Sequence, residues 1–85
     1  MKEFTYTIRD ELGIHARPAG LLVREVKTLD STVTIRKGEQ SVDARRLIAL
    51  MGMGIRQGDT ITVSICGGDE EHAEACLKEF FQTNL

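Results

Sequence analysis

Residues 13–20 read Gly-Ile-His-Ala-Arg-Pro-Ala-Gly, a run whose residue types are not explained by packing. His15 stands where a helix is expected to begin, after a glycine that frees the backbone and before Pro18, which fixes the first turn. Helix N-termini present unpaired amides, so an anion beside His15 would be bound by the amides of Ala16 and Arg17 and by the Arg17 guanidinium. Positive surroundings favour neutral imidazole, whose ring nitrogen can attack phosphorus. The segment therefore predicts phosphoryl chemistry with His15 as the nucleophile.

The same residues leave a plainer interpretation open, in which His15 is an ordinary residue at a helix cap and Arg17 is a solvated charge. Other chemistries have less support, because the sequence contains no Ser/His/Asp triad, no paired-acid site, no phosphate-binding loop and no metal-ligand spacing. His72 stands in a run of acids with no second ligand near it, and we predict that it is solvated. We expect neither a metal nor a cofactor.

The two cysteines, Cys66 and Cys76, are too few for a disulfide framework and lack the C-x-x-C spacing of a zinc or redox site. We predict two buried free thiols, with Cys76 on the buried face of the last helix.

Charge is distributed unevenly along the chain. Residues 14–56 hold eight Lys/Arg and four acids, whereas the remaining residues hold three Lys/Arg and nine acids, for a net charge of −2. This balance argues against general nucleic-acid binding, and the basic centre indicates a localised anionic partner or substrate.

The length of 85 residues predicts a single domain over residues 1–85 with one small core. A composition of 41% hydrophobic and 28% charged residues is typical of an ordered globular chain. No apolar stretch reaches the ~18–20 residues of a membrane span, and the opening Met-Lys-Glu leads into polar alternation. We expect a cytoplasmic protein without membrane insertion.

Two periodicities divide the chain into elements. Polar and apolar residues alternate where strands with one buried face are expected, and apolar residues recur at i, i+3, i+4, i+7 where helices are expected. The expected strands cover residues 3–8, 32–36, 40–42 and 60–65, and the expected helices cover residues 16–28, 46–53 and 70–82. A Lys-Gly-Glu turn joins the second and third strands as an antiparallel hairpin, and Asp69 is a candidate N-cap for the last helix.

The order β-α-β-β-α-β-α, with short connections, favours a four-stranded antiparallel sheet covered by three helices on one face. This is the open-faced β-sandwich of the α+β class. Periodicity predicts no strand order. The helix at residues 46–53 is apolar nearly all round, more than one core face can bury.

The run Gly-Ile-His-Ala-Arg-Pro-Ala-Gly resembles the active-site signature of the histidine-containing phosphocarrier proteins (HPr) of the bacterial phosphoenolpyruvate-dependent sugar phosphotransferase system. The similarity extends across the chain, to its length, its element order, the Leu-Ile-Ala-Leu-Met-Gly-Met run at residues 47–53, the Gln-Gly turn at residues 57–58 and the Gly-Asp-Glu before the last helix.

The resemblance implies a carrier without enzymatic turnover, phosphorylated by enzyme I on Nδ1 of a histidine that matches His15, with Arg17 beside it. The carrier then donates the phosphoryl group to sugar-specific IIA domains. Leu47, Ile48 and Met51 match an exposed apolar patch that docks partners. We expect a monomer whose docking surface includes Gly20, Leu21, Arg24, Lys27, Arg46, Leu47, Ile48, Met51 and Gly52.

One position departs from the family pattern. Members from low-GC Gram-positive bacteria carry a regulatory serine at the start of the second helix, phosphorylated by an ATP-dependent kinase, whereas this sequence has Arg46 there and its nearest serine, Ser41, lies in an expected strand. The resemblance therefore supports the histidine chemistry and leaves the serine chemistry unsupported.

Three other functions stay open from the sequence. A regulatory or nitrogen-type HPr paralogue would use the same phosphorylation for signalling. An acylphosphatase-like enzyme would need an amide side chain to position water, and the only asparagine is Asn84. A protein-binding module using the second helix would leave the residues around His15 unexplained.

Overall fold

The structure is a computed structural model that describes residues 1–85. Its elements follow the predicted order, β1 (Lys2–Thr7), α1 (Ala16–Lys27), β2 (Thr32–Lys37), β3 (Gln40–Asp43), α2 (Leu47–Gly52), β4 (Thr60–Cys66) and α3 (Glu70–Asn84).

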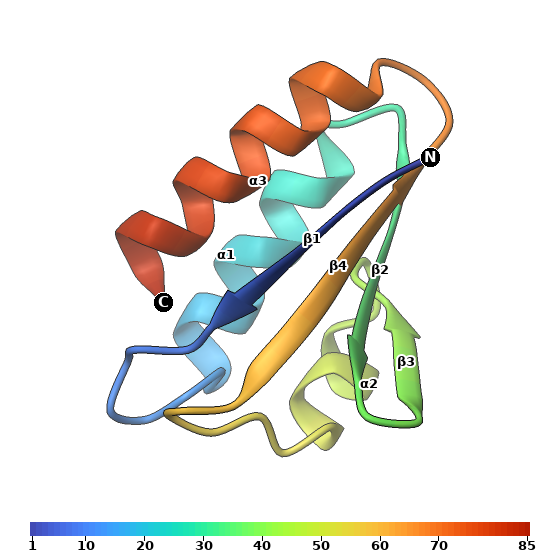
Figure 1. Cartoon of the computed structure of the whole chain (residues 1–85). Helices are drawn as coiled ribbons and strands as arrows, with labels where there is room; N and C mark the ends of the chain where they lie inside the picture. Colours follow the sequence, from blue (N-terminus) through green and yellow to red (C-terminus); the bar gives the residue numbers. More distant parts are fainter.

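The four strands form one sheet in the order β1-β4-β2-β3, and every pair is antiparallel. Residue Val63 of β4 lies opposite Phe4 of β1 and Ile35 of β2, so inward-facing residues of neighbouring strands share a row. The three helices cover one face of this sheet, and the other face is open (Figure 1). The predicted open-faced β-sandwich is confirmed.

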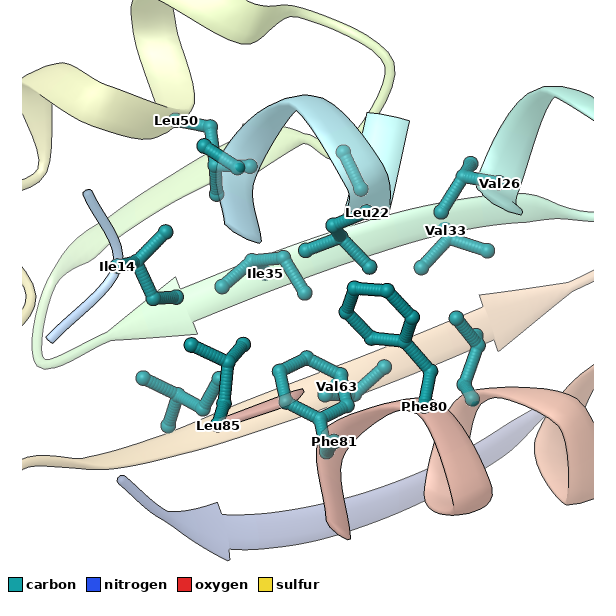
Figure 2. Close-up of a cluster of buried hydrophobic side chains, with 14 of the residues drawn as sticks. Ile14, Leu22, Val26, Val33, Ile35, Leu50, Val63, Phe80, Phe81 and Leu85 are labelled. Carbon is teal, nitrogen blue, oxygen red and sulfur yellow. The ribbon is translucent and has the colours of Figure 1, made fainter. Parts of the chain in front are cut away.

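A single core lies between the sheet and the helices. Strand alternation places Val33, Ile35 and Val63 on the covered face, and Leu22 of α1 and Phe81 of α3 pack onto them (Figure 2). Each of these side chains is fully buried. The burial of apolar surface in this core is the main driving force for folding in a chain of this size.

The last helix is longer than predicted. Asp69 caps its N-terminus as expected, accepting a hydrogen bond from the amide of His72 at 3.1 Å. At the other end the helix continues to Asn84, because the following residue, Leu85, is buried against the core and anchors the final turn (Figure 2). No helix of the structure is of a length and apolar character that would let it cross a membrane.

The prediction of two buried thiols is wrong. Cys66 is exposed and Cys76 is only partly buried. In β4, Ile65 faces the core, so alternation turns Cys66 to the open side of the sheet. On α3, Ala73 and Leu77 occupy the buried stripe, and Cys76 lies at its margin.

Helix α2 is shorter than predicted and buries only Leu50 among its six residues. We expect Leu50→Ala to lower the free energy of unfolding by about 2–5 kcal/mol, because the methyl groups removed leave a cavity. Ile48 lies two positions away in the same helix and is 80% exposed, so Ile48→Ala is the matched control and should change stability by less than about 0.5 kcal/mol. Urea unfolding of both variants measures the difference, and equal losses would contradict the assignment of Leu50 to the core.

Candidate functional site

The segment before α1 is fixed by contacts of its backbone. The amide of Gly13 donates to the carbonyl oxygen of Asp10 at 2.9 Å, and the amide of Ile14 donates to the carbonyl oxygen of Ile55 at 3.1 Å. Gly13 has φ +66°, and a Cβ at this position would collide with the Ile55 carbonyl oxygen and lie 2.7 Å from the Cα of Arg56. Only glycine allows this approach between two loops distant in sequence.

His15 follows directly from this anchored segment. Ile14 buries its side chain in the core (Figure 2). The His15 side chain remains 36% exposed. His15 is the N-cap of α1 with extended backbone, and its side chain makes no capping hydrogen bond. The imidazole is therefore held at the helix terminus while both ring nitrogens stay free of backbone partners.

Two amides at the start of α1 have no acceptor within the protein. Amides of the first helical turn lack an intrahelical carbonyl, and those of Ala16 and Arg17 donate to no group elsewhere. Pro18, the third residue of the helix, is buried and brings no amide. The structure thus leaves two unpaired donors next to the imidazole, the number and type of group that the sequence analysis expected for an anion.

One carboxylate approaches the imidazole, and the sequence analysis missed it. Oδ1 of Asp10 lies 3.8 Å from Nε2 of His15, with Asp10 31% exposed. The same oxygen accepts a hydrogen bond from the amide of Leu12 at 2.8 Å. The expectation of purely positive surroundings for His15 is therefore wrong on this side of the ring. The turn at Gly13 brings Asp10 back towards His15, and no periodicity signals such a return.

Five basic side chains between residues 14 and 56 carry unneutralised charge, and they include Arg24, Lys27 and Arg46 of the predicted docking surface. All five are exposed and none has a carboxylate within ion-pair distance, namely Arg17, Arg24, Lys27, Arg46 and Arg56. Two other basic residues are paired, Arg45 with Asp43 at 3.1 Å and Lys37 with Asp59 at 2.8 Å.

These pairs also act on the acids. Hydrogen bonds from the Arg45 side chain and amide lower the pKa of Asp43 below its ordinary value. A hydrogen bond from Lys37, together with one from the Arg56 amide, lowers the pKa of Asp59. Both carboxyl groups therefore stay ionised at neutral pH and neutralise their own partners, and the five free cations are left to set the local charge.

The apolar side chains of α2 that the core does not bury are exposed. Leu47, Ile48 and Met51 are 37%, 80% and 39% exposed, respectively. Arg46 stands at the N-cap of this helix without a capping hydrogen bond. Helix α2 packs against α1, on which Gly20 and Leu21 are half-buried, and Gly52 ends α2 exposed. The N-terminus of α1 and helix α2 lie at the same end of the molecule (Figure 1).

Two further features escaped the sequence analysis. Leu12, in the loop before His15, is 72% exposed and adds apolar surface there. His72 does have a neighbour with ligand character, since Sγ of Cys76 lies 3.5 Å from its Nε2 one helical turn away. The i, i+4 spacing was a signal for this contact. The structure contains no group of three or more His, Cys, Asp or Glu side chains arranged to hold a metal ion.

Comparisons with known proteins match nearly the whole chain. The model of the family described as PTS HPr component phosphorylation site matches residues 2–83. The phosphocarrier protein HPr of Mycoplasma genitalium is 38% identical over 85 residues, which cover 99% of this chain and 97% of that protein.

Solved structures agree with that match. An HPr structure from Thermoanaerobacter tengcongensis superposes with a TM-score of 0.92 at 34% identity, covering 98% of this chain and 93% of the other. A structure of an HPr dimer from the same organism superposes with a TM-score of 0.76 at 34% identity, covering 98% and 95% of the two chains.

The close approach of Gly13 to the Ile55–Arg56 backbone is testable by substitution. We expect Gly13→Ala to lower the free energy of unfolding by about 3 kcal/mol or more, because positive φ costs about 1–2 kcal/mol for a side-chain residue and the Cβ also displaces a backbone. Gly38 is the matched control, since its φ is +60° and a Cβ there would meet nothing within 4 Å. Gly38→Ala should show the φ cost alone. Equal losses for the two variants in thermal unfolding would mean that the loop contact does not hold the segment.

Proposed function

This chain belongs to the HPr family of phosphocarrier proteins, and from that premise we propose that His15 accepts a phosphoryl group on Nδ1 from phosphorylated enzyme I and donates it to IIA domains in sugar uptake. The observation that carries the proposal is the position of His15, an uncapped and partly exposed imidazole beside the two unpaired amides of Ala16 and Arg17. Incoming phosphoryl oxygens would find donors already oriented, at a helix N-terminus that favours negative charge.

The arrangement suits transfer better than hydrolysis. Nδ1 of a neutral imidazole attacks phosphorus directly, and the Arg17 guanidinium neutralises charge on the transferring oxygens. Asn84, the only asparagine, uses its amide to donate to the carbonyl oxygen of Phe80 and is therefore engaged at the end of α3. An acylphosphatase-like enzyme would need an amide side chain to position water, and the engagement of Asn84 elsewhere favours a phosphoryl carrier over that enzyme.

We propose that partners dock over α2. An apolar centre of Leu47, Ile48 and Met51 would enter a partner pocket, and the free charges of Arg24, Lys27, Arg46 and Arg56 would face an acidic rim around it. Buried apolar contacts hold such a complex, while rim charges mainly speed the encounter. The N-terminus of α1 and helix α2 lie at the same end of the molecule, so a partner docked over α2 would lie near the His15 imidazole (Figure 1).

The same phosphorylation could serve signalling instead of transport, as in a regulatory or nitrogen-type paralogue. Arg46 bears on this alternative, because a guanidinium at the N-cap of α2 cannot accept a phosphoryl ester. Ser41 lies opposite Arg36 in the β2–β3 hairpin. A kinase would therefore have to unpair the edge of the sheet to reach it. We therefore propose control through His15 alone, in a cytoplasmic monomer without a cofactor, and the identity of the IIA partners decides between transport and signalling.

His15→Ala should abolish labelling by phosphoenolpyruvate and enzyme I. The wild-type protein should gain one phosphoryl group that is labile in acid and stable in alkali, as a phosphoramidate is. His72→Ala is the matched control, because it removes the only other histidine and should label as the wild type does. Arg17→Ala should keep its fold and slow transfer by about 10²-fold, since it removes charge stabilisation from the transition state. Intact-mass analysis measures the label, and a labelled His15→Ala protein would refute the proposal.

The docking surface predicts opposite kinetic effects for two substitutions. Arg46→Glu should lower the association rate with enzyme I by about two- to tenfold and change dissociation little, because it acts on a rim charge. Met51→Asp should raise the dissociation rate by about tenfold or more, because it buries a carboxylate in the apolar centre. The association rate of the wild type should also fall as salt rises. Stopped-flow binding at two ionic strengths decides the matter: an association rate indifferent to salt and to Arg46→Glu would make the cations a solvated face only.

A further inference from the structure

We propose that Asp10 is a positioning residue for His15, whose carboxylate keeps the imidazole proton on Nε2 so that Nδ1 accepts and releases the phosphoryl group. The inference rests on the function proposed above and adds to it a residue outside the run at residues 13–20. Asp10 Oδ1 lies 3.8 Å from His15 Nε2, and this is the only carboxylate within ion-pair distance of the ring.

The carboxylate is held in place by its own backbone and side chain. The Asp10 amide donates to the carbonyl oxygen of Leu85 at 2.9 Å, and the Asp10 carbonyl oxygen accepts from the Gly13 amide at 2.9 Å. Its Oδ1 atom accepts from the Leu12 amide at 2.8 Å. These three bonds fix the oxygen before any partner binds, so that little reorganisation is needed during transfer.

The imidazole is the movable member of the pair. At 3.8 Å the two side chains are too far apart for a hydrogen bond. The His15 side chain has no capping bond to restrain it, so a small rotation of the ring closes the distance. Hydrogen bonds of this kind are commonly long in a resting protein and shorten when the reaction begins.

The contact selects the reactive nitrogen. A neutral imidazole carries one N–H, and the hydrogen bond made by one nitrogen decides which nitrogen holds the proton. A carboxylate facing Nε2 favours the Nε2–H tautomer, which leaves the lone pair on Nδ1. An aspartate in a catalytic triad orients its histidine by the same physical effect.

The contact also acts during transfer. The Nδ1 lone pair forms the new N–P bond while the bond between phosphorus and the donor's leaving atom breaks, and that electron pair stays with the donor. Nε2 keeps its proton throughout, so the phosphorylated ring of His15 becomes an imidazolium whose charge faces Asp10. When the phosphoryl group moves on to an acceptor nucleophile, the His15 ring leaves as neutral imidazole, a far better leaving group than imidazolate.

Asp10→Asn isolates the charge from the local fold. The amide oxygen of asparagine can still accept the bond from Leu12, so the turn is kept while the negative charge is lost. Glu11→Gln is the matched control, because it removes one charge from the adjacent exposed residue, which has no ion pair. Asp10→Glu returns the charge and should restore part of the effect.

The first measurement uses unphosphorylated protein labelled with ¹⁵N and needs no donor. Ring ¹⁵N shifts at neutral pH should show mainly the Nε2–H tautomer of His15 in the wild type and in Glu11→Gln, and a shift towards the Nδ1–H tautomer in Asp10→Asn. The second uses protein phosphorylated by phosphoenolpyruvate and enzyme I. Asp10→Asn should accept the group about three- to tenfold more slowly, as expected for a partly exposed charge pair, and its isolated phosphohistidine should hydrolyse more slowly than that of the wild type.

A longer-lived phosphohistidine combined with slower transfer is a result that a merely structural role for Asp10 does not produce. Tautomer populations and phosphohistidine lifetimes in Asp10→Asn equal to those in Glu11→Gln would overturn the inference. A wild-type protein that takes no label would overturn the proposed function instead, and the tautomer measurement alone would then decide whether Asp10 controls the ring.

Discussion

The backbone contact between Gly13 and the Ile55–Arg56 segment determines where His15 lies. It joins the loop after β1 to the loop before β4, two segments that the sheet already brings together because β1 and β4 are neighbours. Ile14 then enters the core and His15 begins α1. Without a side chain at position 13, three consecutive residues provide a backbone anchor, a buried support and a partly exposed imidazole that makes no capping hydrogen bond.

Helices α1 and α2 differ in how much of their apolar surface they bury. Helix α1 buries a full apolar stripe that includes Leu22 and Val26, so its axis and its free N-terminal amides are held rigidly against the sheet. Helix α2 is too short to be stable alone and is held through Leu50, while its remaining apolar side chains face outward. Under the function proposed above, this arrangement would separate the chemistry at the N-terminus of α1 from an exposed apolar surface on α2 that contacts partners.

The sequence predicted those parts of the molecule that depend on local pattern. Alternation and helical spacing located most elements, while the Lys-Gly-Glu turn and the apolar run at residues 47–53 indicated β3 and α2. The residues around His15 predicted phosphoryl chemistry, and this stays a prediction. Features that depend on the tertiary fold could not be predicted from local sequence pattern. The strand order depends on which strands meet after collapse, and Asp10 approaches His15 only because Gly13 reverses the chain. Cys66 was misplaced because buried thiols are common, although the alternation around Ile65 already predicted an outward position.

Arg45 and Arg46 show how neighbouring residues of one type can differ in use. Arg45 is bound to Asp43 through its side chain and amide, and this pairing lowers the pKa of that carboxyl group. Arg46 has a weaker, purely coulombic influence on the same carboxyl and forms no ion pair. A cation at a helix N-cap opposes the positive end of the helix dipole, so helix stability gives no reason for arginine at this position. The docking proposed above would account for its charge, because an acidic rim on a partner would attract an arginine at this position.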